Sequence, residues 1–361
     1  MIKTVGYGAR AATSRLERME FERDDPRPED VVIEVMFTGV CHSDIHQVKN
    51  EWANTVYPCV PGHEIVGRVT RTGDKVSRFR EGDLVGVGCM IESCRACEPC
   101  ESGEENYCEG PNGWLATYNG PMVPASGAEG GENTYGRDNT FGGYSSVVVV
   151  PEDFVLSIPD GLAPEAAAPI LCAGVTTWSP LNHWGIGEGD TVAIVGFGGL
   201  GHMALKLAVA MGVEVTVLTT TPEKIEQAKA MGAHAAYIAT DKTSLVPLAG
   251  SFDLILSTVP DKHEVGPFLD LLKRDASLVV VGNIDIIDGV DNSKLAFHRQ
   301  SVAGSLIGSI AETQDVLDFC ASNGIAPEVE IIDIKDINEA FTRVENGEAR
   351  YRYVIDMSTL G

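Results

Sequence analysis

The sequence lacks features that would place it in a membrane or on nucleic acid. No apolar run approaches the roughly 18 residues of a membrane-spanning helix, and residues 1–25 contain no apolar stretch typical of a secretion signal. Positive charge is scarce, because 27 basic residues face 52 acidic ones and the net charge is −25. Nucleic acid and anionic membranes both attract a positive field. We therefore expect a cytoplasmic protein that binds neither nucleic acid nor a membrane.

The sequence pattern changes near Pro159, which divides the 361 residues into two parts. Before that point, short β-like runs such as residues 30–40 and 63–73 alternate with turn residues, which predicts a small β-rich domain. The stretch Gly110–Gly143 is rich in Gly, Asn and Pro, and a loop of this length is usually functional or mobile. With 44% hydrophobic residues, the chain can build the cores of two domains.

From Asp190 onward, strand-like and helix-like segments alternate. The helical segments end at glycines, Gly212 and Gly232, and the second begins at Pro222. The strand-like segments are short and apolar, and they comprise residues 191–195, 213–218, 252–259 and 277–282. This alternation is typical of an α/β domain with a doubly wound parallel sheet.

A glycine-rich turn follows the first of these strands and matches the dinucleotide pattern G-x-G-x-x-G. Its residues are Gly196, Phe197, Gly198, Gly199, Leu200 and Gly201. Gly196 permits a tight turn, Gly198 lets the backbone approach a pyrophosphate, and Gly201 lets helix and strand pack closely. The helix that follows would offer unpaired N–H groups to the phosphates. A lone match is weak, but this one lies between a strand and a helix.

The end of the second strand predicts which dinucleotide binds. NAD sites place an acidic residue there to hold the ribose hydroxyls. This chain instead has Thr219, Thr220 and Thr221, with Lys224 at the start of the next helix. Hydroxyl donors and a cation suit a 2′-phosphate, which favours NADP(H). The alternative is a polar turn in which a threonine caps the helix.

Four cysteines in one short segment, Cys94, Cys97, Cys100 and Cys108, have the spacing C-x2-C-x2-C-x7-C. Four thiolates at this spacing can converge on one tetrahedral Zn²⁺ of the structural kind. A disulfide framework is disfavoured by the size of the chain and the missing signal peptide. An iron–sulfur site is a second alternative, although no proline directly follows the last cysteine as it does in bacterial ferredoxins.

Three further segments carry metal-binding residue types. Cys41 lies in GVCHSDIH, His63 and Glu64 lie in PGHE, and Cys172 lies in PILCAGVTTW. A buried cysteine alone is usually a small packing residue. The residues by themselves do not show that these segments meet.

The chain resembles the zinc-dependent medium-chain alcohol dehydrogenases, and within them the cinnamyl alcohol dehydrogenase-like NADP-dependent aldehyde reductases. The matching motifs follow the family order nearly from end to end: GVCHSDIH, YPCVPGHEIVG, the four-cysteine segment, FGGYS, LCAGVTT, GFGGLGHM, LTTTPEK, GSLIGS and YRYVID. The resemblance implies a GroES-like β-rich catalytic domain, residues 1–160 completed by 305–361, and a Rossmann NADP-binding domain at 161–304. The active site would lie in the cleft between them.

The resemblance also implies site roles. A catalytic zinc would be bound by Cys41, His63 and Cys172. Glu64 would approach or bind this zinc, and Asp44 would orient His63. Alcohol dehydrogenases are the standard example of such a site, where zinc polarises the aldehyde oxygen.

Proton delivery and cofactor contacts follow from the same resemblance. Ser43 and His46 would relay a proton to the substrate oxygen, and His42 would lie near the pyrophosphate. The alternative for His46 is an exposed surface histidine. Further NADP contacts would be Thr176, Thr258, Gly282, Ser305, Leu306 and Ile307.

The implied function is hydride transfer between NADP(H) and an aldehyde/primary alcohol pair, aromatic or medium-chain aliphatic. The enzyme would hold two zinc ions per chain and form a homodimer through its nucleotide domains. Two rival classes are a zinc-free quinone reductase, which would normally lack Cys41, His63 and the four-cysteine segment, and a non-catalytic binding protein, which should have lost some ligands. Trp52, Trp114 and Tyr118 either line an apolar substrate pocket or pack in the core.

Overall fold

The computed structural model describes residues 1–110, 115–119, 140–282, 286–287 and 290–361. They form two compact units, residues 1–172 with 309–361 and residues 173–308. These units are defined by compactness, and the domain boundaries implied by family resemblance stay a prediction. Trp114 and most of the Gly110–Gly143 stretch lie outside the described residues.

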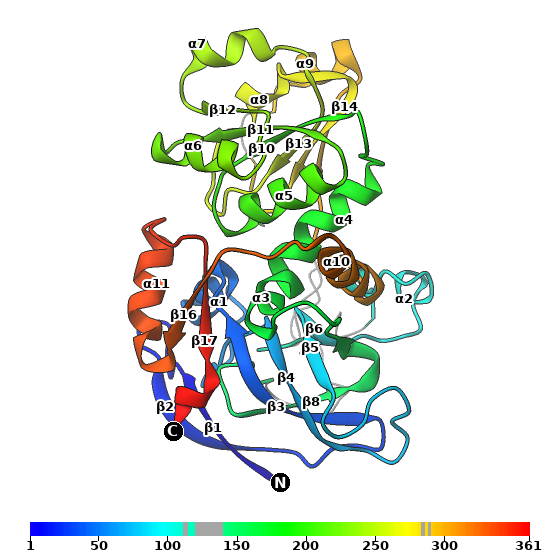
Figure 1. Ribbon diagram of the computed structural model, residues 1–361, viewed down its shortest axis with the longest axis vertical. Coiled ribbons are helices and arrows are strands. Elements are labelled where there is room, and N and C mark those ends of the chain that lie inside the picture. The colour runs from blue at the N-terminus through cyan, green and yellow to red at the C-terminus, as the bar shows by residue number, and fades with distance from the viewer. Residues whose placement is uncertain (111–114, 120–139, 283–285, 288–289) are drawn as a thin grey trace. The chain divides into compact units, whose positions relative to one another are not determined.

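The first unit is built on a seven-stranded sheet with the order β16-β17-β3-β4-β5-β9, in which β8 also pairs with β3 (Figure 1). Neighbouring strands are antiparallel except for β16 and β17. The strands are β3 (Asp30–Gly39), β4 (Ile65–Thr72), β5 (Leu84–Val87), β8 (Val147–Pro151), β9 (Leu156–Ser157), β16 (Val329–Asp333) and β17 (Arg352–Asp356). The two β-like runs predicted before Pro159 correspond to β3 and β4, so that part of the prediction is confirmed.

Two small sheets and several helices complete this unit. The sheets pair β1 (Ile2–Gly8) with β2 (Glu17–Arg23), and β6 (Met90–Glu92) with β7 (Leu115–Ala116). The helices are α1 (His42–Val48), α2 (Glu98–Glu101), α3 (Pro164–Pro169), α10 (Ile310–Asn323) and α11 (Ile337–Glu345). Short helical turns are η1 (Glu105–Tyr107), η2 (Glu152–Phe154), η5 (Ile334–Asp336) and η6 (Met357–Leu360). Helix α3 packs on β3 and β4, where Ile33 and Ile65 are fully buried.

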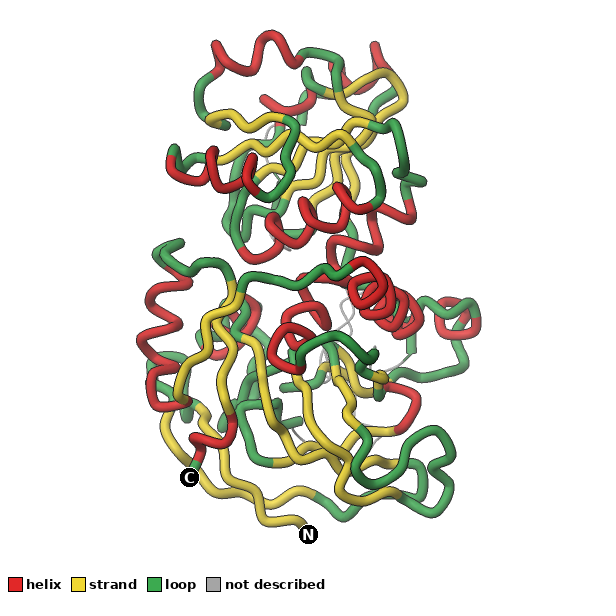
Figure 2. The backbone as a smooth tube through the Cα atoms, viewed as in Figure 1, coloured by secondary structure: helices red, strands yellow, loops and turns green. Residues whose placement is uncertain are grey.

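The second unit contains one six-stranded sheet that is parallel throughout, with the order β12-β11-β10-β13-β14-β15. Its strands are β10 (Thr191–Val195), β11 (Glu214–Thr219), β12 (Ala235–Ile238), β13 (Phe252–Ser257), β14 (Leu272–Val280) and β15 (Ser301–Gly304). Its helical segments are α4 (Val175–His183), α5 (Gly199–Ala210), α6 (Glu223–Ala230), α7 (Lys242–Leu245), η4 (Val246–Leu248), α8 (Gly266–Leu269) and α9 (Asn292–His298). Figure 2 shows helices on both sides of the sheet.

This topology confirms the predicted doubly wound parallel sheet, whose strand order is that of a Rossmann fold. Strand β14 begins at Leu272, before the predicted start at Ser277. Charged residues at 273–275 conceal the beginning of the strand in the sequence. Leu272 nevertheless pairs with Phe252, and the register shifts before the pair Leu254–Ser277. No helix in the described ranges is both long and apolar enough to cross a membrane.

Candidate metal and nucleotide sites

The separated segments that carry Cys41, His63, Glu64 and Cys172 meet in the first unit. One potential ligand atom from each of these residues lies within 4.8 Å of the others, and all four residues are buried. The Cys41 and Cys172 sulfurs are 4.0 Å apart, and His63 Nε2 is 3.3 Å from Cys172 Sγ. Two sulfurs, one imidazole nitrogen and one carboxylate are a donor set that suits Zn²⁺.

Local backbone structure brings these donors together. Cys41 follows β3 and occupies the N-cap of α1, while His63 and Glu64 immediately precede β4. Because β3 and β4 are antiparallel neighbours, the end of one strand lies beside the start of the other, and Gly39 N donates to Glu64 O at 2.9 Å. Cys172 lies in the π-helical segment η3 (Ile170–Gly174) between α3 and α4. Single π-turns inside helices are frequent at functional sites.

Asp44 orients the histidine of this cluster. Its carboxylate is fully buried, and Oδ1 lies 3.0 Å from His63 Nδ1. This contact directs Nε2 of the ring toward Cys172. Burial opposes a charge on His63, but the nearby Asp44 carboxylate and Cys89 sulfur raise the pKa of His63 well above its usual range. A carboxylate behind a ligating histidine fixes its tautomer and increases its basicity.

The contact between the two sulfurs shifts the pKa values of Cys41 and Cys172 in opposite directions. A hydrogen bond from the Cys172 thiol, with the positive charges of Arg352 and His63, lowers the pKa of Cys41 well below its usual range, although burial opposes the change. The same contact raises the pKa of Cys172. Two buried thiolates at this separation would repel each other strongly in a low dielectric. A divalent cation between them removes that repulsion, so the residues present fit the metal.

Glu64 adds a buried carboxylate of which only one oxygen is hydrogen-bonded. Arg352 of β17 donates from Nη2 to Glu64 Oε1, and both side chains are buried. The other oxygen, Oε2, is buried and has no hydrogen-bond partner within the described part of the chain. A buried carboxylate in this cluster that keeps one oxygen unpaired also fits a cation.

The predicted relay residues lie on α1 beside the cluster. Ser43 Oγ is 3.7 Å from Cys41 Sγ, and the half-buried His46 lies one helical turn further on. His46 Nδ1 pairs with a carboxylate oxygen of Glu51, and its ring lies near His42 and Trp52, with centroids 5.6 and 5.5 Å apart. The chain thus places a hydroxyl at the cluster and an imidazole–carboxylate pair closer to solvent. The relay itself stays a prediction.

The four-cysteine segment forms a second cluster in the same unit. Cys94, Cys97, Cys100 and Cys108 bring their sulfurs within 4.8 Å of one another, and all nine cysteines are free thiols. Backbone N–H groups of residues 94, 97, 109 and 110 lie 3.3–3.4 Å from sulfurs of the cluster. Such donors stabilise thiolates, so the arrangement fits a closed tetrahedral metal site and not a disulfide framework.

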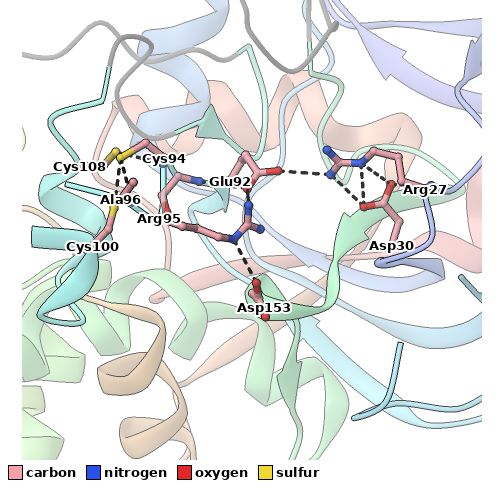
Figure 3. A network of polar contacts seen from close by, with 10 residues as sticks. Arg27, Asp30, Glu92, Cys94, Arg95, Ala96, Cys100, Cys108 and Asp153 are labelled. Carbon is pink, nitrogen blue, oxygen red and sulfur yellow. Dashed lines mark hydrogen bonds and ion pairs between the residues drawn. The ribbon is translucent and has the colours of Figure 1, made fainter. Parts of the chain in front are cut away.

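A polar network anchors this segment to the rest of the unit (Figure 3). Arg95 has a positive φ of 56° and contacts Glu92 at 2.5 Å and Asp153 at 3.1 Å. Arg27 contacts Glu92 at 3.3 Å and Asp30 at 2.9 Å. Glu92 is only 2% exposed, and two guanidinium groups compensate its buried charge.

In the second unit, the glycine turn has the geometry expected for a phosphate-binding loop. Gly196 has a φ of +92°, which favours glycine, and α5 begins directly at Gly199. A Cβ on Gly201 would collide with the Gly196 carbonyl oxygen, whereas the space beside Gly198 is open. Thr258 Oγ1 donates to Val195 O at 3.0 Å and to Gly196 O at 3.2 Å, which fixes the turn to the end of β13.

The end of β11 combines a hydroxyl with a cation. Thr219 is buried and its Oγ1 accepts from Thr221 N at 3.2 Å, while Thr220 is exposed. This contact does not cap α6, whose N-cap residue is Pro222. Lys224 is half-buried, and burial lowers its pKa. Among the residues the structure describes, no carboxylate lies within 4.0 Å of its ammonium group.

The remaining predicted cofactor residues lie in the same unit. Thr176 is buried in α4, and a Cβ on Gly282 would meet the Val259 backbone after β13. Ser305, Leu306 and Ile307 directly follow β15, and Ile307 has a positive φ of 43°. Their contacts with a cofactor stay predictions.

Four site residues were missed by sequence reasoning. Arg352 pairs with Glu64, Glu51 pairs with His46, and the hydroxyl of Tyr144 donates to Asp44 at 3.3 Å. Cys89 is the fourth, and a hydrogen bond with the Cys172 thiol lowers its pKa. Arg352 lies in the motif YRYVID and Tyr144 lies in the motif FGGYS. These motifs could have marked both residues as candidates, but neither motif indicates which site residue its member contacts.

Comparisons with known proteins agree over almost the whole chain. The family profile described as "Alcohol dehydrogenase GroES-like domain" matches residues 27–160, and "Zinc-binding dehydrogenase" matches residues 199–322. Aldehyde reductase YahK of Escherichia coli is 47% identical over 99% of both chains. An NADP-dependent alcohol dehydrogenase C of Mycolicibacterium smegmatis is 47% identical over 98% of both chains.

Solved structures show the same similarity in three dimensions. A cinnamyl alcohol dehydrogenase from Sorghum bicolor is 39% identical, with a TM-score of 0.91 over 99% of this chain and 98% of that one. An enzyme of the same name from Helicobacter pylori, complexed with NADP(H), is 36% identical, with a TM-score of 0.89 over 99% of both chains.

The four-cysteine cluster predicts a stability phenotype for one substitution. We expect Cys100→Ser to lose one metal ion per chain and to lower Tm by about 5–10 °C, because roughly 2–4 °C is lost per kcal/mol in a unit of this size. Metal analysis and thermal unfolding measure both effects. Cys320→Ala, which removes a buried thiol outside both clusters, is the control and should keep its metal. Unchanged metal content and Tm in Cys100→Ser would contradict a structural metal site.

Proposed function

The chain belongs to the zinc-dependent medium-chain alcohol dehydrogenase family, and on that premise we propose that it is an NADP-dependent aldehyde reductase. It transfers hydride between NADP(H) and an aldehyde/primary alcohol pair, aromatic or medium-chain aliphatic. The observation that carries the proposal is the buried cluster of Cys41, His63 and Cys172, with the partly unsatisfied Glu64 beside it. Its relatives' names, which include an aldehyde reductase and NADP-dependent alcohol dehydrogenases, support the direction and the cofactor.

The first unit supplies the residues that hold and protonate the substrate. Cys41, His63 and Cys172 hold the zinc, which when bound acts as a Lewis acid toward the aldehyde oxygen. Asp44 keeps His63 in the ligating tautomer. Ser43, beside Cys41, supplies a proton at the substrate oxygen, and His46 passes it from solvent. Glu51 pairs with His46 Nδ1 and so holds the imidazole in place beside α1.

The second unit supplies the residues that bind NADP(H). The open backbone at Gly198 and the start of α5 receive the pyrophosphate. Lys224 without a carboxylate partner in the described residues, and the hydroxyls at the end of β11, receive the 2′-phosphate.

Removal of one ligand thiol tests the proposed catalytic site. Cys172→Ala should lower the zinc content from about two ions per chain to one, and NADPH-dependent aldehyde reduction should fall by roughly a hundredfold or more. Zinc analysis and initial rates with an aldehyde panel measure this. Cys59→Ala, a buried thiol outside both clusters, should retain both properties. Full turnover of Cys172→Ala would disprove the metal assignment.

Cofactor preference tests the phosphate site. Thr219→Asp should shift the ratio of kcat/KM toward NADH, because a carboxylate repels the 2′-phosphate and accepts from a ribose diol. Lys224→Ala should raise KM for NADPH about ten- to a hundredfold, or roughly 1.5–3 kcal/mol, with little effect on NADH.

Lys229→Ala is the matched control, since this exposed lysine lies on the same helix and pairs with Glu226. Its cofactor ratio should stay at the wild-type value. A wild-type preference for NADH, or an unmoved ratio in both site variants, would show that the threonines only shape a turn.

We also propose that the protein is a cytoplasmic homodimer. Strand β15 is the edge of the parallel sheet, so its outer N–H and C=O groups have no neighbouring strand in the described chain. Phe297, in α9 just before β15 in the chain, is an apolar side chain that is 85% exposed. Pairing of two β15 edges would cover the open strand edge and the exposed apolar surface. The nine free thiols support a reducing compartment, as the cytoplasm is.

The dimer proposal predicts a change in mass for one exposed substitution. Phe297→Asp should shift the protein from dimer to monomer in size-exclusion chromatography with light scattering, because the charge would be buried in the interface. Val246→Asp, at 71% exposure in η4, is the control and should leave the mass unchanged. A wild-type monomer, or a dimeric Phe297→Asp, would contradict pairing at this edge.

A further inference from the structure

Asp44 is a fully buried carboxylate with four hydrogen-bond donors around it. Oδ1 accepts from Gly62 N at 2.9 Å and is 3.0 Å from His63 Nδ1. Oδ2 accepts from Cys41 N at 3.0 Å and from the hydroxyl of Tyr144 at 3.3 Å. Three of these donors belong to the two segments that carry Cys41 and His63. The fourth reaches in from a segment 100 residues further along the chain.

The direction of the Tyr144 hydroxyl is fixed by its own surroundings. Backbone hydrogen bonds join residues 142–144 to residues 60–62, with Gly142 N to Val60 O at 2.7 Å, Gly143 N to Gly62 O at 2.8 Å and Tyr144 N to Pro61 O at 2.9 Å. Tyr144 is fully buried. The segment that carries this tyrosine therefore lies against the turn that precedes His63, and the ring has little freedom to move.

Glycine at position 62 allows this packing. Gly62 has a φ of +104°, and a Cβ there would come within 2.6 Å of the Tyr144 ring. On the other side, Tyr144 O accepts from Tyr7 N of β1 at 2.8 Å, and the ring lies 6.3 Å from the Phe341 ring of α11. Three separate parts of the unit thus hold the tyrosine against the Asp44 carboxylate.

Loss of the hydroxyl would leave Asp44 Oδ2 with the Cys41 N–H donor alone. A buried carboxylate that lacks a donor is destabilised and can rotate to seek another partner. Any rotation moves Oδ1 as well, and Oδ1 is the atom that orients His63. Outer-shell partners of ligating histidines typically contribute ten- to a hundredfold in metal affinity, and a group one contact further out should contribute less.

We infer that Tyr144 is a positioning residue of the catalytic zinc site, whose hydroxyl holds Asp44 and thereby fixes His63 for metal binding. The inference rests on the zinc site proposed above, at Cys41, His63 and Cys172. Tyr144 touches no reacting atom in this account. It acts by reducing the rate at which the site releases its metal.

The test measures zinc release from the holoenzyme to a chromogenic chelator in excess. Wild-type protein should release zinc in two phases, and the phase missing in Cys172→Ala identifies the catalytic site. In Tyr144→Phe the catalytic phase should be about three- to tenfold faster, while the four-cysteine phase keeps its rate. Tyr57→Phe is the matched control, because it removes a tyrosine hydroxyl that donates to Val48 O at 2.7 Å on α1. Both of its phases should match the wild type.

A double-mutant cycle with Asp44→Asn separates positioning from a general loss of stability. If Tyr144 acts through Asp44, Tyr144→Phe should add nothing to the release rate in the Asp44→Asn background. An additive effect, or equal acceleration of both phases, would assign Tyr144 a merely structural role and overturn the inference.

The two proposals fail in different ways. Release of a single zinc ion by the wild type would refute the proposed catalytic site, and this inference with it. Two zinc ions with unchanged kinetics in Tyr144→Phe would refute the positioning role alone.

Discussion

Repulsion between buried sulfurs is the constraint on which the first unit depends. Cys41 and Cys172 lie 4.0 Å apart beside His63, and Glu64 keeps one carboxylate oxygen without a hydrogen bond in the described chain. If both sulfurs are ionised at this distance in a low dielectric, a cation must neutralise them. Arg352 pairs with Glu64, while the contact between the two sulfurs lowers the pKa of Cys41 and raises that of Cys172. The folded chain is therefore organised for a divalent metal.

The surrounding structure holds that arrangement in place. Strands β3 and β4 set Cys41 and His63 side by side, and the π-turn η3 presents Cys172 to them. Asp44 ties the two strand ends together through backbone and side-chain hydrogen bonds. The four-cysteine cluster lies in the same unit but has its own backbone donors and its own anchoring arginine, Arg95. Loss of one cluster should therefore leave the other folded.

Local patterns in the sequence predicted local structure well. The strand, glycine turn and helix around Gly196 form within a few residues of one another, so their spacing was enough to predict a dinucleotide site. The four cysteines likewise converge over a short segment. Contacts between distant segments carry no such signal. Cys172 meets His63 across 109 residues and Cys41 across 131 residues, and only resemblance to a family joined them.

The partners of the site residues were the hardest to predict. Arg352, Tyr144 and Glu51 are ordinary residue types, and their importance comes from which side chain the fold brings to them. The start of β14 was missed for a related reason, because Leu272 pairs with Phe252 ahead of the charged residues 273–275, where the register shifts. The partners of the site residues and the start of β14 were both determined by contacts between segments that are distant in the sequence.

Anomalous diffraction at the zinc absorption edge tests the central claim most directly. Crystals of the protein prepared without added chelator should show two strong peaks per chain. One should lie among Cys41, His63 and Cys172, and the other among the four cysteines Cys94, Cys97, Cys100 and Cys108. The absence of a peak at the first position in fully loaded protein would contradict the account, because the two sulfurs would then be stable together without a metal.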